Sequence, residues 1–397
     1  MKLFEPYTLP CGAIIPNRIV KSAMSENMAD QGGKPSQEII NLYKRWGKGK
    51  AGILISGNVM ISSKSLGEPH NVVIENENYL EELSEWARVS QSEGSKLWMQ
   101  INHPGRQGPK RINKEVVSPS DVQLPMAKLF AKPRPLTEKE IWEIIDGFGN
   151  TALIAKKAGW SGVQIHGAHG YLVSQFLSTR TNLRQDQWGG TLENRARFPL
   201  EIYKNMRAKV GHNFPVGIKI NSADFQRGAF TEEDSMEVIQ LLSEAGMDMI
   251  EVSGGTYERS AMMGTMHKKS TQNREAYFAE FIIKVRKKTS VPLLLTGGFR
   301  TMSTMESALV NDELDFVGMA RPFAINPDIP IEFKSGKIDY VRADIKRTGI
   351  KAIDKLGMLD IQWYNQQMRR MGDLKKPDPK LNVWWTLLSS VKEQIVG

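Results

Sequence analysis

Eight short apolar segments, rich in β-branched residues, recur along this chain of 397 residues, and each ends in small or polar residues. Segments with helical periodicity lie between them, including 137–158, 194–210, 231–245 and 276–287. Buried parallel strands read as near-continuous apolar runs, and their crossovers are usually helices. An open sheet would normally stop at about five to seven strands, so eight predict a closed (β/α)8 barrel of the α/β class. The eight segments are 18–23, 52–58, 96–102, 162–167, 216–222, 247–254, 292–298 and 315–321.

The two ends of the chain depart from this alternation. The first 17 residues carry the turn signals Leu9-Pro10-Cys11-Gly12 and Pro16-Asn17, which predict a short hairpin that closes the barrel floor. The alternation of strands and helices stops near residue 330. We therefore expect a barrel over 1–330 and a mostly helical C-terminal extension over 331–397.

Composition narrows the class of protein. The formal net charge is +9, but the basic residues are scattered and form no long run, which favours a solvated surface over a nucleic-acid partner. No apolar stretch is long enough to span a membrane, and Glu5 and Pro6 interrupt any N-terminal signal segment. Cys11 is the only cysteine, which excludes an intrachain disulfide and a cysteine-ligated cluster. A cytoplasmic setting is the expectation.

Polar and ionisable residues gather where the predicted strands end. Barrel enzymes assemble their active sites at this C-terminal rim, from the ends of several strands. A purely structural barrel has no need to concentrate such groups at one end. The residues in question are Ser22, Ser25, Gln100, His166, His169, Lys219 and Arg321.

The segment His166-Gly-Ala-His169-Gly-Tyr171 follows the fourth predicted strand. Its glycines allow a tight turn, so that both imidazoles and the phenol can converge on one point. Two imidazoles side by side can donate hydrogen bonds to a carbonyl oxygen that gains negative charge. The phenol of Tyr171 can then supply a proton to a nearby carbon. No third ligand stands at a convincing spacing, so we expect no metal ion.

This segment carries a resemblance to a known family. HGAHGYLVSQFLS, followed by DQWGGTLENRARF at 186–198, resembles the central signature of the Old Yellow Enzyme family, which are FMN-dependent ene-reductases. Shorter matching pieces include NRIV at 17–20, QINHPGR at 100–106 and TGGF at 296–299, and the match extends over roughly residues 3–330. The resemblance implies tightly bound FMN, with NADPH or NADH as a transient reductant.

The phosphate of FMN is expected at the loops after strands seven and eight, where barrels commonly hold phosphate. Gly297 and Gly298 permit close backbone approach, and Arg321 adds a planar cation. Ala320 replaces the glycine that is usual in the family before this arginine, although its N–H remains available.

The resemblance also places residues around the flavin ring. Lys219 would be a costly buried charge unless an anion lies beside it, and in the family a cation here, most often arginine, lies against flavin N1/O2. Gln100 matches the glutamine that pairs with the pyrimidine edge. Ser25 stands where relatives carry Thr or Cys, and Asn27 where some bacterial relatives carry a substrate-contacting tyrosine. Positions that line the ring are matched by Ser22, Ala23, Met24 and Gly57.

The implied reaction is ping-pong reduction of an activated C=C bond in an α,β-unsaturated carbonyl or nitro compound. His166 and His169 would bind the substrate oxygen, and Tyr171 would protonate the α-carbon. No Rossmann GxGxxG motif is present, which fits nicotinamide as a transient substrate.

Other readings stay open. A tRNA dihydrouridine synthase-like enzyme would need a cysteine after the third strand, and a dienoyl-CoA reductase-like enzyme would need an iron–sulfur segment; Cys11 serves neither purpose. A non-catalytic flavin-binding barrel is the third alternative. The apolar stripe around Trp384 and Trp385, within 383–395, could attach to a membrane surface, but is expected to pack on its own barrel or on a neighbouring subunit, as in a homo-oligomer.

Overall fold

The computed structural model describes residues 1–387, apart from 257, 259–274, 277, 351–353 and 355–357. Eight parallel strands form a closed barrel, because Val317 of the last strand pairs with Ile19 of the first and Val20 pairs with Ile53 of the second. All eight predicted strands are present, so the predicted (β/α)8 fold is confirmed. Their bounds are β3 (Ile19–Lys21), β4 (Ile53–Met60), β6 (Lys96–Asn102), β9 (Gly162–Gly167), β10 (Val216–Asn221), β11 (Met249–Ser253), β12 (Leu293–Thr296) and β13 (Phe316–Met319).

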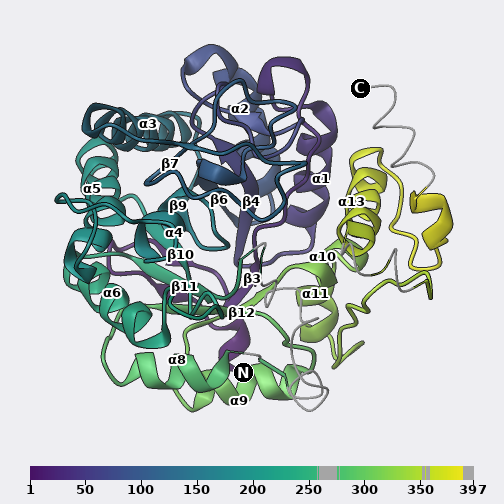
Figure 1. Cartoon of the computed structure of the whole chain (residues 1–397). Coiled ribbons are helices and arrows are strands. Elements are labelled where there is room, and N and C mark those ends of the chain that lie inside the picture. The colour runs from purple at the N-terminus through teal and green to yellow at the C-terminus, as the bar shows by residue number, and fades with distance from the viewer. Residues whose placement is uncertain (257, 259–274, 277, 351–353, 355–357, 388–397) are drawn as a thin grey trace.

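Helices surround the barrel on its outer side (Figure 1). The four helices expected from periodicity are found within a few residues of their predicted bounds, as α3, α5, α6 and α8. The α-helices are α1 (Gln37–Lys48), α2 (Leu80–Gln91), α3 (Glu138–Lys157), α4 (Leu172–Leu177), α5 (Leu192–Val210), α6 (Glu232–Glu244), α8 (Ala279–Arg286), α9 (Met302–Val310), α10 (Arg321–Ile325), α11 (Ile329–Lys334) and α13 (Met358–Gly372). Short 3-10 helices cover Lys2–Phe4, Gln31–Gly33, Glu77–Tyr79 and Gly105–Gln107.

Local sequence explains where the long helices begin. The hydroxyl of Thr137 accepts a hydrogen bond from the backbone N–H of Glu140, whose carboxylate accepts from the backbone of Thr137, and Thr231 and Asp234 form the same capping box at α6. Such reciprocal caps satisfy N–H groups that have no partner within the helix. The α3 and α6 helices therefore start at the residues that the sequence signals.

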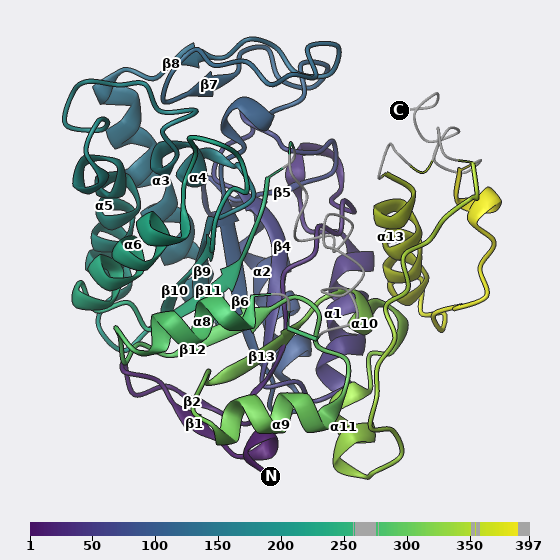
Figure 2. The same cartoon turned by 60° about the horizontal axis from the view of Figure 1, so that its bottom comes forward.

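The predicted N-terminal hairpin is also confirmed. Strands β1 (Tyr7–Thr8) and β2 (Ile14–Ile15) pair antiparallel and lie at the end of the barrel opposite to the β7–β8 segment (Figure 2). Leu9 and Ile15 are buried in one apolar cluster with barrel residues that include Trp98 and Phe316. The hairpin therefore closes the barrel floor.

The opposite rim carries longer excursions. Strand β5 (Val72–Val73) pairs in parallel with the C-terminal end of β4, and β7 (Val117–Ser118) pairs with β8 (Arg134–Pro135) in the segment after β6. The C-terminal α13 packs outside the barrel, against α1 and α10 (Figure 1). The proposed division of the chain near residue 330 stays a prediction, and residues 388–397 of the tryptophan-containing segment lie outside the described residues. Within the described part, no helix combines the length and apolar character needed to cross a bilayer.

Candidate active site

The interior of the barrel changes from apolar to polar toward the C-terminal ends of its strands. Side chains at positions i and i+2 of a strand face the same side, so Trp98 at the floor is followed by Gln100, and Met249 is followed by Glu251. The lower residues of these pairs are buried in the apolar floor cluster. The upper layer is polar, as predicted, and it brings together Gln100, Gln164, His166, Lys219 and Glu251, all at most 4% exposed.

His166, His169 and Tyr171 converge as predicted from their spacing. The ring centroid of His166 lies 5.2 Å from that of His169 and 4.8 Å from that of Tyr171, both in edge-on arrangements. The turn depends on two residues with positive φ, His169 at 60° and Gly170 at 79°. A side chain at Gly170 would also crowd the Gln107 side chain, which lies 3.0 Å from where its Cβ would be. Glycine is therefore required at this second position.

Each histidine is held by a specific contact. The Nε2 of His169 lies 2.9 Å from the Oγ of Ser253, and its backbone N–H donates to the Oδ1 of Asn221 at 3.1 Å. The Nδ1 of His166 accepts from the backbone N–H of Ala168 at 3.3 Å. An imidazole whose Nδ1 accepts carries its proton on Nε2, so this edge of His166 is a donor.

The surroundings of both imidazoles favour their neutral form. Burial lowers the pKa of both His166 and His169 well below the usual value, and the positive charge of Lys219 lowers each pKa further. The nearby His103, which is 4% exposed, has its pKa lowered to about 4 by burial. Neutral rings can hold a substrate oxygen by hydrogen bonds without carrying a full charge.

The phenol of Tyr171 has a neighbour that sequence reasoning missed. The side-chain Nδ2 of Asn58, near the end of β4, donates to the phenol oxygen at 3.4 Å. A donor to this oxygen favours the deprotonated form, which helps a phenol to give up its proton. Tyr171 is itself 5% exposed.

The predicted phosphate loops have the expected backbone. Gly297 and Gly298 follow β12 with φ of 132° and 93°, which glycine adopts readily. Arg321 begins α10 directly after Ala320, and its guanidinium donates to the Oδ2 of Asp360 at 2.9 Å. Asp360 belongs to α13, so the C-terminal extension reaches the predicted phosphate arginine.

The loop after β3 holds the other predicted flavin contacts. Ser22 is buried and its hydroxyl lies 2.6 Å from the hydroxyl of Thr296, whereas Ala23 and Met24 are half-buried. The hydroxyl of Ser25 donates to the carboxylate of Glu68, whose pKa is raised by burial. The residues of this loop therefore lie at the rim, but Ser25 already has a partner within the protein.

Gly57 is required for a reason that the sequence does not show. A Cβ at this position would lie 2.1 Å from a carboxylate oxygen of Glu26 and 2.3 Å from the carbonyl oxygen of Met24. The Gly57 backbone N–H donates to the Oε1 of Glu26 at 2.8 Å. The close approach therefore comes from the β3 loop.

Lys219 has an anionic partner within the protein that the sequence did not indicate. The Oε1 of Glu251 lies 3.0 Å from its Nζ, and the expected contact of Lys219 with the flavin stays a prediction. Sequence reasoning missed both Glu251 and Gln164. A usable signal exists, because each is a lone polar residue inside an apolar strand, two positions before a polar strand-end residue, His166 or Ser253.

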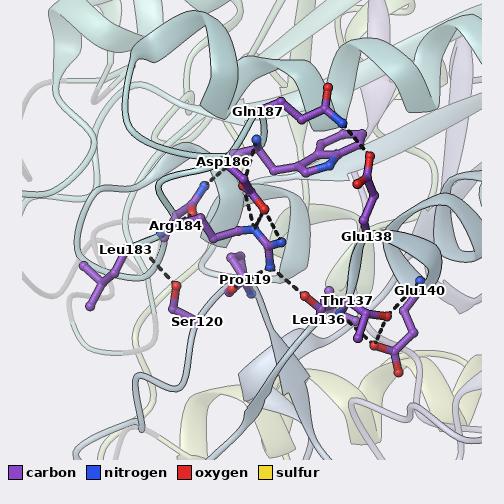
Figure 3. A network of polar contacts seen from close by, with 12 residues as sticks. Pro119, Ser120, Leu136, Thr137, Glu138, Glu140, Leu183, Arg184, Asp186 and Gln187 are labelled. Atoms are coloured by element: carbon purple, nitrogen blue, oxygen red, sulfur yellow. Dashed lines mark hydrogen bonds and ion pairs between the residues drawn. The ribbon is translucent and has the colours of Figure 1, made fainter.

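The long loop after β9 is fastened to the excursion after β6 (Figure 3). The guanidinium of Arg184 donates to the carbonyl oxygens of Pro119 and Leu136, at 3.3 and 2.6 Å, and pairs with Asp186. Asp186 also accepts from the backbone N–H of Trp188 at 3.1 Å. These contacts give Asp186 a structural role in this loop.

Arg195 and Arg197 act on the same loop. Arg195 donates to the carbonyl oxygen of Leu177, and the Nε of Arg197 donates to that of Gln187 at 2.8 Å. These two arginines, from the first turns of α5, thereby help to hold the loop in place. Among the described residues, no group of three or more His, Cys, Asp or Glu side chains could hold a metal ion.

Comparison with known proteins agrees with this architecture. The family model of the NADH:flavin oxidoreductase / NADH oxidase family matches residues 2–339. The NADH-dependent flavin oxidoreductase iliE of Hypocrea jecorina (strain QM6a) is 39% identical over 351 residues, covering 82% of this chain and 87% of the relative.

Solved structures show the same fold. The Old Yellow Enzyme homologue from Zymomonas mobilis superposes with a TM-score of 0.74 at 25% identity, covering 87% of this chain and 95% of that one. A 2-naphthoyl-CoA reductase superposes with a TM-score of 0.79 at 26% identity, covering 84% of this chain and 52% of that one. This chain therefore spans about half the length of that reductase.

The chain belongs to the NADH:flavin oxidoreductase / NADH oxidase family, which is the Old Yellow Enzyme family. It is accordingly an FMN-dependent flavin oxidoreductase that uses NADH or NADPH. The residues present fit the cofactor, because the side-chain oxygen of Gln100 has no donor among the described residues and lies in the same buried layer as the cation of Lys219. The family and cofactor inferred from the sequence are confirmed.

Proposed function

We propose that this enzyme reduces the activated C=C bond of α,β-unsaturated carbonyl or nitro compounds by a ping-pong mechanism. The observation that carries the proposal is the pair of imidazoles of His166, which is buried, and His169, which is half-buried, with centroids 5.2 Å apart, beside the phenol of Tyr171. Bound FMN supplies hydride chemistry, in which NADH or NADPH is the donor and the alkene the acceptor.

The residues of the chain divide the remaining work. His166 and His169 bind the carbonyl or nitro oxygen and stabilise the negative charge that develops there, which makes the β-carbon electron-poor. Tyr171 delivers a proton to the α-carbon, helped by the Asn58 amide at its phenol oxygen. Because their lowered pKa values favour neutral imidazoles, His166 and His169 can bind the substrate oxygen without adding a charge to the site.

We also propose which residues would hold FMN. Lys219 and Gln100 would lie at its pyrimidine edge, and the ring would be lined by Ser22, Ala23, Met24, Ser25 and Gly57. Gly297, Gly298, Ala320 and Arg321 would hold the phosphate, and His166 would border both the ring and the substrate.

The test is an anaerobic two-step titration of the purified protein. Stoichiometric NADH or NADPH should bleach the visible flavin absorbance, and 2-cyclohexenone or a nitroalkene should restore it with release of the saturated product. His166→Ala and His169→Ala should weaken phenol binding far more than FMN binding, whereas the exposed His212→Ala is a matched control that should change neither. Flavin that is reduced but not reoxidised by either alkene would instead favour a non-catalytic barrel or another substrate class.

A further inference from the structure

A chain of four buried polar side chains crosses the upper layer of the barrel. The Nζ of Lys219 lies 3.0 Å from the Oε1 of Glu251, and the Oε2 of Glu251 accepts from the Nε2 of Gln164 at 2.8 Å. The Oε1 of Gln164 accepts from the Nε2 of Gln100, also at 2.8 Å. The strand register places the members side by side, because Lys219 pairs with Glu251 across β10 and β11, and Gln100 pairs with Gln164 across β6 and β9.

The carboxylate of Glu251, which lies between Lys219 and Gln164, imposes a direction on the two amides. An ionised carboxylate only accepts hydrogen bonds, so Gln164 must turn its NH2 group toward Glu251. Its oxygen is then left for the NH2 group of Gln100, and the oxygen of Gln100 is left without a donor among the described residues. Glu251 therefore determines, through Gln164, that Gln100 presents an acceptor. An acceptor suits the N3–H donor on the pyrimidine edge of a flavin.

The same carboxylate offsets the charge of Lys219. Glu251 is fully buried and Lys219 is 4% exposed, so water screens their interaction little. An uncompensated cation beside the pyrimidine edge would stabilise reduced over oxidised flavin, because reduction adds electron density there. A carboxylate 3.0 Å from that cation opposes this preference.

We propose that Glu251 is a positioning residue that lowers the reduction potential of the bound flavin and orients the amide of Gln100. The inference rests on the proposed cofactor contacts of Lys219 and Gln100, and it is independent of the alkene that the enzyme reduces. It assigns two effects to one side chain, a charge effect through Lys219 and an orientation effect through Gln164.

Two variants separate these effects. Glu251→Gln removes the charge, and should increase the ratio of affinities for reduced and oxidised FMN about tenfold, an upward shift of about 30 mV for a two-electron couple. Gln164→Leu keeps the Lys219–Glu251 pair but interrupts the relay, and should weaken binding of both redox forms of FMN by the same factor, about fivefold. Asp248→Asn is the matched control. Asp248 is a buried carboxylate that directly precedes β11, the strand of Glu251, and it pairs with Arg207 at the N-terminal end of that strand. Affinities for FMN come from fluorescence titration, and potentials from equilibration with a reference dye.

The inference is overturned if Glu251→Gln leaves the affinity ratio at its wild-type value, or if Asp248→Asn changes that ratio equally. Should Glu251→Gln not fold, Gln164→Leu decides alone, and unchanged affinity for FMN refutes the relay. A wild-type protein that binds no FMN would refute the proposed cofactor contacts as well. Failure to reduce enones would refute only the proposed function, since no alkene enters these measurements.

Discussion

The Nε2 of His169 lies 2.9 Å from the Oγ of Ser253, although the two residues are 84 positions apart in the sequence. His169 belongs to the loop after β9, and Ser253 is the last residue of β11, two strands further around the barrel. The contact holds one ring edge of His169, while its backbone N–H is held by Asn221. The ring orientation of His169 therefore depends on a residue outside its own loop.

Replacing Ser253 by alanine should weaken binding of phenols, which imitate the substrate oxygen. Loss of one hydrogen bond of about 1 kcal/mol corresponds to roughly a fivefold rise in Kd, since His169 is then free to rotate. The perturbation of the flavin spectrum by a phenol measures this Kd. Ser90→Ala is a suitable control, because Ser90 is also buried and its hydroxyl donates to the carbonyl oxygen of Trp86 within α2. Unchanged phenol affinity would show that Ser253 does not orient His169.

Replacing Tyr171 by phenylalanine should slow alkene reduction by about 10²-fold or more, as expected for loss of a general acid. Flavin reduction by NADH or NADPH needs no proton from Tyr171 and should stay within about twofold of wild type. Rapid mixing measures the two half-reactions separately. Tyr203→Phe, which removes a phenol bonded to the Gly246 carbonyl outside the barrel, should affect neither. A parallel loss in both half-reactions would contradict the role given to Tyr171.

Acid should destabilise the protein partly through His103. Its folded-state pKa of about 4 lies below the ordinary value of 6.5, so the unfolded chain binds the additional proton between these two values. Stability is therefore highest above about pH 6.5 and falls as the pH drops toward 4, with about 2 kcal/mol lost by pH 5 through this residue.

His103→Asn should reduce that loss of stability. The Nδ1 of His103 accepts a hydrogen bond from the backbone N–H of Gly105 at 3.1 Å, and asparagine retains an acceptor for it. Urea unfolding at pH 7 and pH 5 measures the difference. The pKa values of His166 and His169 are also lowered, so the variant retains part of the dependence of the free energy of unfolding on pH. If variant and wild type showed the same dependence of the free energy of unfolding on pH, the pKa of His103 would not be lowered in the folded protein.

Replacing Arg184 by alanine should loosen the two loops that it joins. Its charged hydrogen bonds to the carbonyls of Pro119 and Leu136 are largely buried, so we expect a loss of about 2 kcal/mol in the free energy of unfolding. Amide hydrogen exchange should rise in residues 119–136 and 182–188. Arg134→Ala removes a more exposed arginine from the same region and should cost less than about 1 kcal/mol. Equal costs would contradict the anchoring role.

The eight strands and the floor hairpin could be predicted from the sequence because their signals are local. A strand buried on both faces must be apolar throughout, and a helix such as α3 announces its start with Thr137 and Glu140. The convergence of His166, His169 and Tyr171 was predictable for the same reason, since a six-residue turn brings them together.

The partners of the site residues were decided only by the tertiary structure. Glu251 meets Lys219, Asp360 meets Arg321 and Ser253 meets His169, in each case across strands or helices that are distant in the chain. A buried charge or hydrogen-bonding group requires a partner, but the requirement does not say which residue satisfies it. Barrel closure and strand register make that choice, because they determine which side chains share a layer.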